Sequence, residues 1–457
     1  MSKITNYRIV TSENPSTNEQ RAASFIRQNI KLVCGKKVAM VKDSEEPAAL
    51  EIVVGKTSRE ALDGITLERS RNGVWEYVIF KKGDRIYVTG LGCAPDEEPA
   101  YTSAYRKLDD GCIGTVMAAN HFVEDILGYQ FIYANYDEFP ESPDLEMPTE
   151  YDYRFTREHM RAQRPKKIEG AALYSINASE RIDWNIGSFI LKTREGKITV
   201  IDGGHGEELP RLIECLKSVS GEEVPTVTAW IFSHLHGDHY GAYVRLCNDE
   251  AFKGALVVKD MYCNFLEKDF CTKISSEAGP GYAPIWDTMM SSDKTLGTNI
   301  HVVKTGDVIA VDEIEFEVLH VPDIEYGPKM NINDSSVVYK MTYDKGQTIM
   351  FLGDAEWVCD NDLLANHADK LSSDVVQVGH HGCGNVSRRC YELINAKAYI
   401  WQCGERFWYQ DSGEGLNTHN VGFIRYRAFM KEIGVKNENI YVTMGDIDSF
   451  PLPMPIY

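Results

Sequence analysis

The sequence predicts an α/β protein of at least two domains, and three observations support this class. The chain has 457 residues, which is more than one ordinary hydrophobic core accommodates. Short apolar runs typical of buried strands alternate with stretches of helical spacing. Several apolar runs in the second half end in acids or histidines. We therefore expect a small α/β domain followed by a larger α/β domain that carries a functional site.

Residues 1–137 are predicted to form the first domain. Ser16 and Glu19 have the spacing of a capping box, and they open a helix that Gly35 ends. Turn residues separate the short apolar runs that follow, as they do in hairpins. The other expected elements are strands at 50–55, 75–80, 85–90 and 130–133, and a helix at 115–127.

Residues 138–167 are predicted to be a linker, because prolines and acids recur there without periodicity. The second domain then covers 168–457. Residues 260–300 within it are rich in Tyr, Phe, Met, Gly and Pro, and we expect an irregular insertion at the mouth of a pocket. The first strands of this domain are expected at 172–176, 188–192 and 197–202.

A dense group of metal-binding residue types follows an apolar run at 230–233. His234 and His236 share a face if the chain there is extended, and Asp238 and His239 come directly after a glycine that permits a turn. Imidazole with an added carboxylate suits zinc, manganese or iron. The alternative is a histidine-rich surface turn, which this register behind an apolar strand disfavours. The segment therefore predicts a metal site.

The run His-Leu-His-Gly-Asp-His at 234–239 resembles the signature of the metallo-β-lactamase-fold hydrolases. This resemblance implies an αββα sandwich for residues 168–457. It also implies further ligands at the ends of other strands, and one or two metal ions per chain. Zn²⁺ is the expected ion, with Mn²⁺ or Fe²⁺ as alternatives.

The further ligands implied by the resemblance occur in the expected order. Asp202 ends one strand and would orient a metal-binding histidine, although it could instead cap the following helix. Asp354 resembles the bridging acid of the family, with a surface acid as the alternative. Of the pair that follows a third strand, we assign His380 to the second metal and His381 to an acid/base or substrate contact. The reverse order and a pair of core histidines are the alternatives.

The usual third histidine of the first metal is not obvious. His301 and His320 lie in the right interval without the usual context, and His320 is the better candidate. This departure resembles the metallo-β-lactamase-like domain of DNA-internalisation competence proteins, over roughly residues 170–450. In that branch, two histidines with water or the Asn333–Asp334 region would hold the first metal. Further residues that match the branch are Ser387 and His419, the latter a candidate substrate contact.

The first domain has a resemblance of its own. The strand at 51–55, the hairpin and the helix leading to 126–131 are similar to the N-terminal accessory domains of α-glucuronidases and related glycoside hydrolases. Such domains are usually non-catalytic. The resemblance implies a carbohydrate context, and a packing or dimerisation module is the alternative.

The amino-acid composition limits which classes of binding partner are expected. The net charge of −20 argues against a protein that wraps extended nucleic acid, whereas a small anionic substrate remains compatible with bound dications. The N-terminus has no apolar leader, and no apolar run is long enough to span a bilayer. The eleven cysteines lack paired spacing. We therefore expect a cytoplasmic protein with reduced thiols and no membrane association; the sequence leaves its oligomeric state open.

The predicted activity is metal-assisted hydrolysis, in which bound cations lower the pKa of a water molecule. A phosphodiester or nucleotide-like substrate is the first hypothesis, because the branch resemblance favours phosphoryl chemistry. Asp238, His381 and Asp354 are the candidate catalytic residues. One alternative is hydrolysis of a carbohydrate-linked ester or lactone. The other is a non-catalytic glycan-binding protein with a structural metal.

Overall fold

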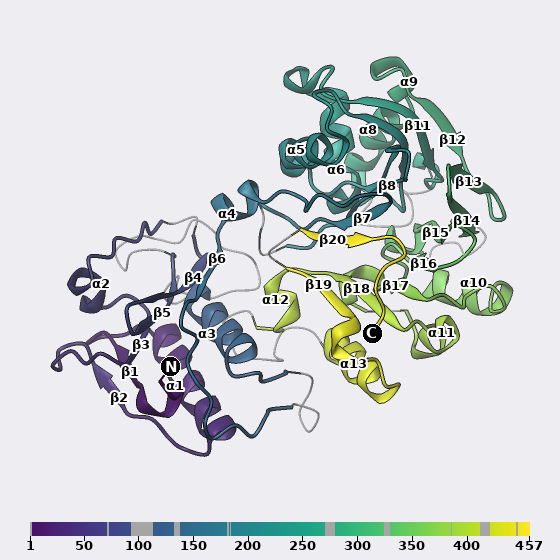
Figure 1. Ribbon diagram of the computed structural model, residues 1–457. Helices are drawn as coiled ribbons and strands as arrows, with labels where there is room; N and C mark the ends of the chain where they lie inside the picture. The colour runs from purple at the N-terminus through teal and green to yellow at the C-terminus, as the bar shows by residue number, and fades with distance from the viewer. Residues whose placement is uncertain are drawn as a thin grey trace. The chain divides into compact units, whose positions relative to one another are not determined.

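The computed structural model describes residues 2–70, 73–92, 113–131, 138–180, 182, 184–269, 279–323, 330–384, 386–411, 421–444 and 447–457. The chain forms two compact units. Unit 1 comprises Met1–Met160 and Glu405–Ala428, and unit 2 comprises Arg161–Gly404 and Phe429–Tyr457. Each unit has its own sheet or sheets, as Figure 1 shows.

Unit 1 is built on a six-stranded mixed sheet with the strand order β2-β1-β3-β5-β4-β6. The first four strands in this order are parallel, whereas β4 is antiparallel to both of its neighbours. The strands are β1 (Arg8–Thr11), β2 (Met40–Lys42), β3 (Glu51–Val54), β4 (Tyr77–Lys82), β5 (Arg85–Gly90) and β6 (Asp152–Phe155).

The helices of unit 1 follow the expected capping signals. The side chain of Ser16 accepts the N–H of Glu19, and the Glu19 side chain accepts the N–H of Ser16, so the predicted capping box is confirmed. Gly35 ends this helix in the left-handed region with a φ of 72°. The helices are α1 (Thr17–Cys34), α2 (Ser58–Leu62), α3 (Ile113–Asp125) and α12 (Glu405–Trp408); α4 (Arg157–Ala162) and α13 (Val421–Glu432) cross the division between the units.

Two segments are placed differently from the sequence-based boundaries. The segment predicted as a linker, 138–167, contains β6, which pairs with β4. Its Phe155 ring stacks on Tyr77 of β4 at a centroid distance of 5.4 Å, so this part of the segment is packed against the sheet of unit 1. Residues 405–428, which we assigned to the second domain, belong to unit 1. Of the strand expected at 130–133, residues 132 and 133 lie outside the described part of the chain.

Unit 2 contains two seven-stranded mixed sheets. Their strand orders are β12-β11-β10-β9-β8-β7-β20 and β13-β14-β15-β16-β17-β18-β19. The first sheet consists of β7 (Ala172–Ser175), β8 (Ser188–Lys192), β9 (Ile198–Asp202), β10 (Thr226–Ile231), β11 (Val257–Cys263), β12 (Asn299–Val302) and β20 (Asp448–Pro451). The second consists of β13 (Val308–Val311), β14 (Ile314–His320), β15 (Val338–Tyr343), β16 (Thr348–Phe351), β17 (Val375–Gln377), β18 (Ala398–Gln402) and β19 (Ile440–Thr443).

The two sheets of unit 2 pack face to face. Ile231 of the first sheet and Phe351 of the second belong to one buried apolar cluster. Trp230, on the opposite face of the same strand, belongs to a second cluster with Leu212 and Tyr243 of the covering helices. The helices are α5 (Leu209–Ser220), α6 (Gly237–Asn248), α8 (Gly279–Met289), α9 (Ser292–Thr295), α10 (Trp357–Asn366) and α11 (Arg388–Ile394). The predicted αββα sandwich is therefore confirmed.

The segment 260–300 is more regular than expected. It contains the end of β11, the helices α8 and α9 and the edge strand β12, while 270–278 lie outside the described residues. Tyr282 and Met289 of α8 are buried in the core of unit 2. The aromatic and methionine content of the described part thus reflects packing, and the prediction that this part is irregular is wrong; its place at the mouth of a pocket stays a prediction. Among the described residues, no helix combines the length and the apolar composition that crossing a bilayer requires.

Candidate metal centre

The histidine segment lies between a buried strand and a helix. β10 ends shortly before His234, and α6 begins directly after His236, which occupies its N-cap position. Asp238 and His239 lie in the first turn of α6. The His234 ring centroid lies 4.9 Å from that of His236 and 4.3 Å from that of His239. The strand end and the helix start therefore bring these side chains together.

Two strands of the second sheet deliver the remaining side chains. Asp354 follows β16, and His380 and His381 follow β17. Between β16 and Asp354, Gly353 has a φ of 55° and lies against the loop after β10. A Cβ atom on Gly353 would lie 2.7 Å from the Cβ of Ser233, so only glycine permits this approach. The two sheets thus meet at the site.

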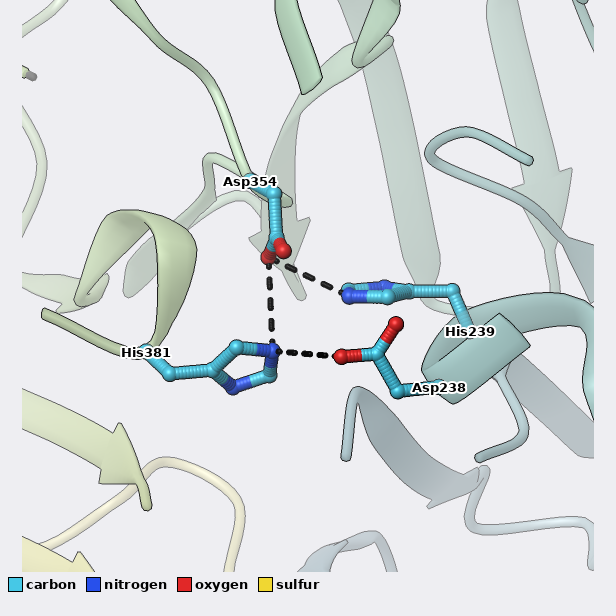
Figure 2. Close-up of side chains that lie close together, drawn as sticks. All are labelled: Asp238, His239, Asp354 and His381. Carbon is cyan, nitrogen blue, oxygen red and sulfur yellow. Dashed lines mark ion pairs between the residues drawn. The ribbon is translucent and has the colours of Figure 1, made fainter. Parts of the chain in front are cut away.

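Two groups of donor atoms converge and share one carboxylate. The Oδ1 atom of Asp354 lies 3.2 Å from His239 Nε2 and 3.6 Å from His381 Nε2. Dashed lines in Figure 2 mark both pairs. The Oδ2 atom of Asp354 lies 3.9 Å from His234 Nε2. Within each group, all donor atoms lie within 4.8 Å of one another. The groups are Asp238, His239, Asp354 and His381, and His234, His236 and Asp354.

The donor set fits a bound metal ion. Several of its buried nitrogen and oxygen atoms have no hydrogen-bond partner among the described residues. Leaving such atoms unpaired away from water costs about 1–3 kcal/mol each, and bound cations would satisfy them. The atoms are His234 Nε2, His239 Nε2, His381 Nε2 and Asp354 Oδ1.

The opposite ring nitrogens are held by the protein. His239 Nδ1 lies 2.9 Å from Asp202 Oδ2. His381 Nδ1 lies 3.0 Å from the carbonyl oxygen of Gln402 at the end of β18. These acceptors place the proton on Nδ1, so each Nε2 lone pair is turned toward the donor group.

Burial and charge set the protonation of the donors. Burial, together with the nearby His239, holds the pKa of the His234 imidazole well below its usual value. Burial opposes ionisation of Asp354, but His239, His381 and His380 outweigh it and hold the pKa of this carboxyl well below its usual value. For these two donors, the neutral imidazole of His234 and the ionised carboxylate of Asp354 are the forms that bind metal.

Asp202 lies behind the donor group, where the sequence places an orienting acid. Its Oδ1 accepts the N–H of Ser233 at 2.8 Å, and its Oδ2 faces His239. Asp202 has a φ of 57°, a conformation that asparagine also tolerates. The alternative role as a helix cap is not seen, because the helix begins beyond Asp202, at α5.

We predict that Asp202→Asn lowers metal affinity about 10- to 100-fold without loss of the fold, because an amide no longer fixes the proton on His239 Nδ1. A chelator-competition titration with Zn²⁺ measures this change. Asp260→Asn is the matched control, because Asp260 also pairs with a histidine, His301, at 2.8 Å on the surface. Equal affinities for the Asp202→Asn variant and the wild type would contradict the role.

The structure reverses the roles that the sequence analysis assigns to His380 and His381. His381 Nε2 lies 3.6 Å from both Asp238 Oδ2 and Asp354 Oδ1 and belongs to the donor group. His380 Nε2 lies 3.9 Å from Asp354 Oδ2, outside both groups. Both histidines have φ values near 50°, but their partners differ: His381 Nδ1 faces the Gln402 carbonyl oxygen and His380 Nδ1 faces Glu356. This is the reverse of our first assignment.

The candidates for the missing third histidine lie elsewhere. His320 is buried at the end of β14 with its Nδ1 2.6 Å from Asp362 Oδ2, and it belongs to neither donor group. His301 lies on the edge strand β12 beside Asp260. Among the described residues, the donor group with His234 and His236 therefore contains these two histidines and Asp354.

The residues matching the branch resemblance have mainly structural contacts. Asp334 is buried and accepts the N–H of Val358, near the start of α10. Ser387 is the N-cap of α11. Asn333 lies closer to the site, with its Nδ2 3.3 Å from His380 Nε2. His419 lies outside the described residues.

Sequence reasoning missed one acid beside the site. Glu356 comes two residues after Asp354, and its Oε1 lies 3.1 Å from His380 Nδ1. The only available signal was its place in the run Gly-Asp-Ala-Glu. A second acid after the bridging position does not by itself indicate which histidine it contacts.

Comparison with known proteins agrees with this geometry. Residues 182–382 match the family model described as the metallo-beta-lactamase superfamily. The fold of unit 2 and its His/Asp cluster are typical of the metal-dependent hydrolases of this superfamily. The match lies within unit 2, so the resemblance of residues 1–137 to glycoside hydrolase accessory domains stays a prediction.

Individual relatives are distant. ComE operon protein 3 of Bacillus subtilis (strain 168) is 22% identical over 214 residues, which cover 45% of this chain and 24% of that protein. The chain thus spans about a quarter of this relative. The metallo-β-lactamase fold protein YhfI from Bacillus subtilis matches 62% of this chain and 100% of its own at 12% identity and a TM-score of 0.36. Unliganded yeast PDE1 matches 61% and 99% at 12% identity and a TM-score of 0.36.

Proposed function

We propose that this protein hydrolyses a phosphodiester or another small nucleotide-like substrate with two divalent cations. The position of Asp354 carries the proposal. Its Oδ1 faces one donor group and its Oδ2 faces the other. A carboxylate placed in this way would help to hold two dications, which would supply charge stabilisation for displacement at phosphorus.

Different residues of the chain would have different roles in this reaction. Bound cations would lower the pKa of a water molecule and polarise a phosphoryl oxygen. Asp202 and the Gln402 carbonyl fix the rings of His239 and His381. His380 is left outside both donor groups with its Nε2 toward Asp354, so it is the histidine that can contact the substrate.

The charge of the protein and its resemblance both bear on the substrate. A net charge of −20 favours a small substrate over extended nucleic acid, because an acidic protein repels a long phosphate backbone. The resemblance of residues 170–450 to the competence-protein branch favours phosphoryl chemistry.

A substrate panel tests the proposal. We expect zinc- or manganese-loaded protein to bind about two metal ions per chain and to hydrolyse bis(p-nitrophenyl) phosphate or a cyclic nucleotide. His236→Ala should abolish this turnover while circular dichroism stays unchanged. Hydrolysis of sugar esters or lactones alone would establish the alternative substrate class. Undiminished activity after complete metal removal would overturn the proposal.

A further inference from the structure

Glu356 gathers hydrogen-bond donors from separate segments of unit 2. It occupies the N-cap position of α10 and is buried. Its Oε2 accepts Asn331 Nδ2 at 2.9 Å, and its Oε1 accepts Asn333 Nδ2 at 3.0 Å. The Oε1 atom also lies 3.1 Å from His380 Nδ1. Two amide donors and the ring of His380 thus meet at one side chain.

Only a carboxylate suits this position. An ionised carboxylate accepts through both oxygens, whereas a glutamine would turn an NH₂ group toward one of the donors. Burial of such a charge is costly unless it is paired and hydrogen-bonded, as Glu356 is here. The arrangement is therefore specific for glutamate.

The same contacts fix the ring of His380. Glu356 faces its Nδ1, and Asn333 Nδ2 lies 3.3 Å from its Nε2. Its backbone N–H donates to the carbonyl oxygen of Gly353 at 3.0 Å. His380 has a φ of 48° and a ψ of 45°, a conformation that persists in a non-glycine residue only where the surroundings determine it.

The fixed ring is turned toward the shared carboxylate. Its Nε2 lies 3.9 Å from Asp354 Oδ2, and its side chain is 24% exposed, against 3% for His381. His380 is thus open to a ligand at the edge of the site, while His381 is enclosed in the donor group.

We propose that Glu356 is a positioning residue that faces Nδ1 of His380 and orients its ring toward the substrate bound beside Asp354. This inference rests on the proposed function. Glu356 itself touches neither the substrate nor the donor groups, and it acts through His380. Its effect should therefore disappear when the imidazole is absent.

A double-mutant cycle with zinc-loaded protein tests this dependence. We expect Glu356→Gln to lower kcat for the best phosphodiester about 10- to 100-fold, the usual range for a group that orients an active-site histidine. Zinc content should stay at the wild-type value. In the His380→Ala background, the same substitution should change kcat less than about twofold. An equal loss in both backgrounds would overturn the proposal.

A second measurement does not depend on turnover. In ¹⁵N-histidine-labelled, zinc-loaded protein, the His380 signals are identified by their loss in His380→Ala. We expect a proton on Nδ1 of His380 in the wild type, and a changed Nδ1 shift in Glu356→Gln. Glu313→Gln is the control. Glu313 also accepts a hydrogen bond, from the N–H of Arg194 at 2.7 Å, and it directly precedes the start of β14.

The two measurements separate the possible failures. An unprotonated Nδ1 on His380 would overturn the positioning role, whatever the substrate is. Absence of phosphodiester turnover together with a protonated Nδ1 that responds to Glu356→Gln would overturn the proposed function and retain the Glu356–His380 pairing.

Discussion

Asp354→Ala should remove both metal ions and lower phosphodiester turnover at least about 1,000-fold. Asp354 is the one residue common to both donor groups, and its two oxygens face His234 on one side and His239 and His381 on the other. Without it, neither group retains a shared anionic ligand. A thousandfold loss corresponds to about 4 kcal/mol of transition-state stabilisation, which is within the range of metal-ion catalysis.

Metal analysis and kinetics together check this expectation. Bound zinc should fall from about two equivalents to fewer than one after gel filtration. Asp369→Ala is the matched control, because Asp369 is an exposed acid beyond α10 and should leave metal content and kcat unchanged. Two full equivalents of zinc in Asp354→Ala would contradict the bridging role.

Glu405→Gln should stabilise the protein at alkaline pH. Glu405 begins α12 and is buried in unit 1. Its Oε1 accepts the hydroxyls of Tyr77 and Tyr153, whereas its Oε2 has no hydrogen-bond partner among the described residues. Burial is the largest cause, and it raises the pKa of Glu405 from 4.5 to about 8.

The direction of the pH dependence follows from this shift. The folded protein keeps the proton on Glu405 up to about pH 8, whereas the unfolded chain loses it near pH 4.5. The unfolded state therefore binds fewer protons in this window, and the free energy of unfolding falls as the pH rises. Over the whole window the loss is on the order of 4–5 kcal/mol.

Denaturant unfolding at pH 5, 7 and 9, followed by tryptophan fluorescence, measures the effect. Glutamine cannot ionise, so the stability of Glu405→Gln relative to wild type should increase by several kcal/mol between pH 5 and pH 9. Other titrating groups, including His121, whose pKa burial lowers to about 4, are common to both proteins and cancel in the difference. Equal pH slopes for the two proteins would show that Glu405 is ionised in the fold.

Local sequence determined the helices and strands and the types of residue in the metal centre. The capping box at Ser16 and Glu19 satisfies helix donors from within four residues, so no distant partner is needed to predict it. The spacing of His234 and His236 behind an apolar strand is equally local. Strand ends followed by acids or histidines also identified Asp202 and Asp354, because a buried strand can place polar side chains only where it ends.

The tertiary structure decided which of these groups meet. His380 and His381 are adjacent and identical in type, and the Gln402 carbonyl at the end of β18 and Glu356 at the start of α10 determine which ring enters the donor group. Neither partner is near the pair in sequence.

The dependence on partners that are distant in sequence also explains the other differences between the sequence-based predictions and the structure. Asp334 matches the branch in sequence, yet the fold uses it to accept the N–H of Val358. Residues 405–428 follow unit 2 strands in sequence but belong to unit 1, where Glu405 meets Tyr77. Hydrophobic periodicity and capping act over a few residues, so they can be predicted from the sequence. The choice among distant partners depends on packing, which only the folded chain defines.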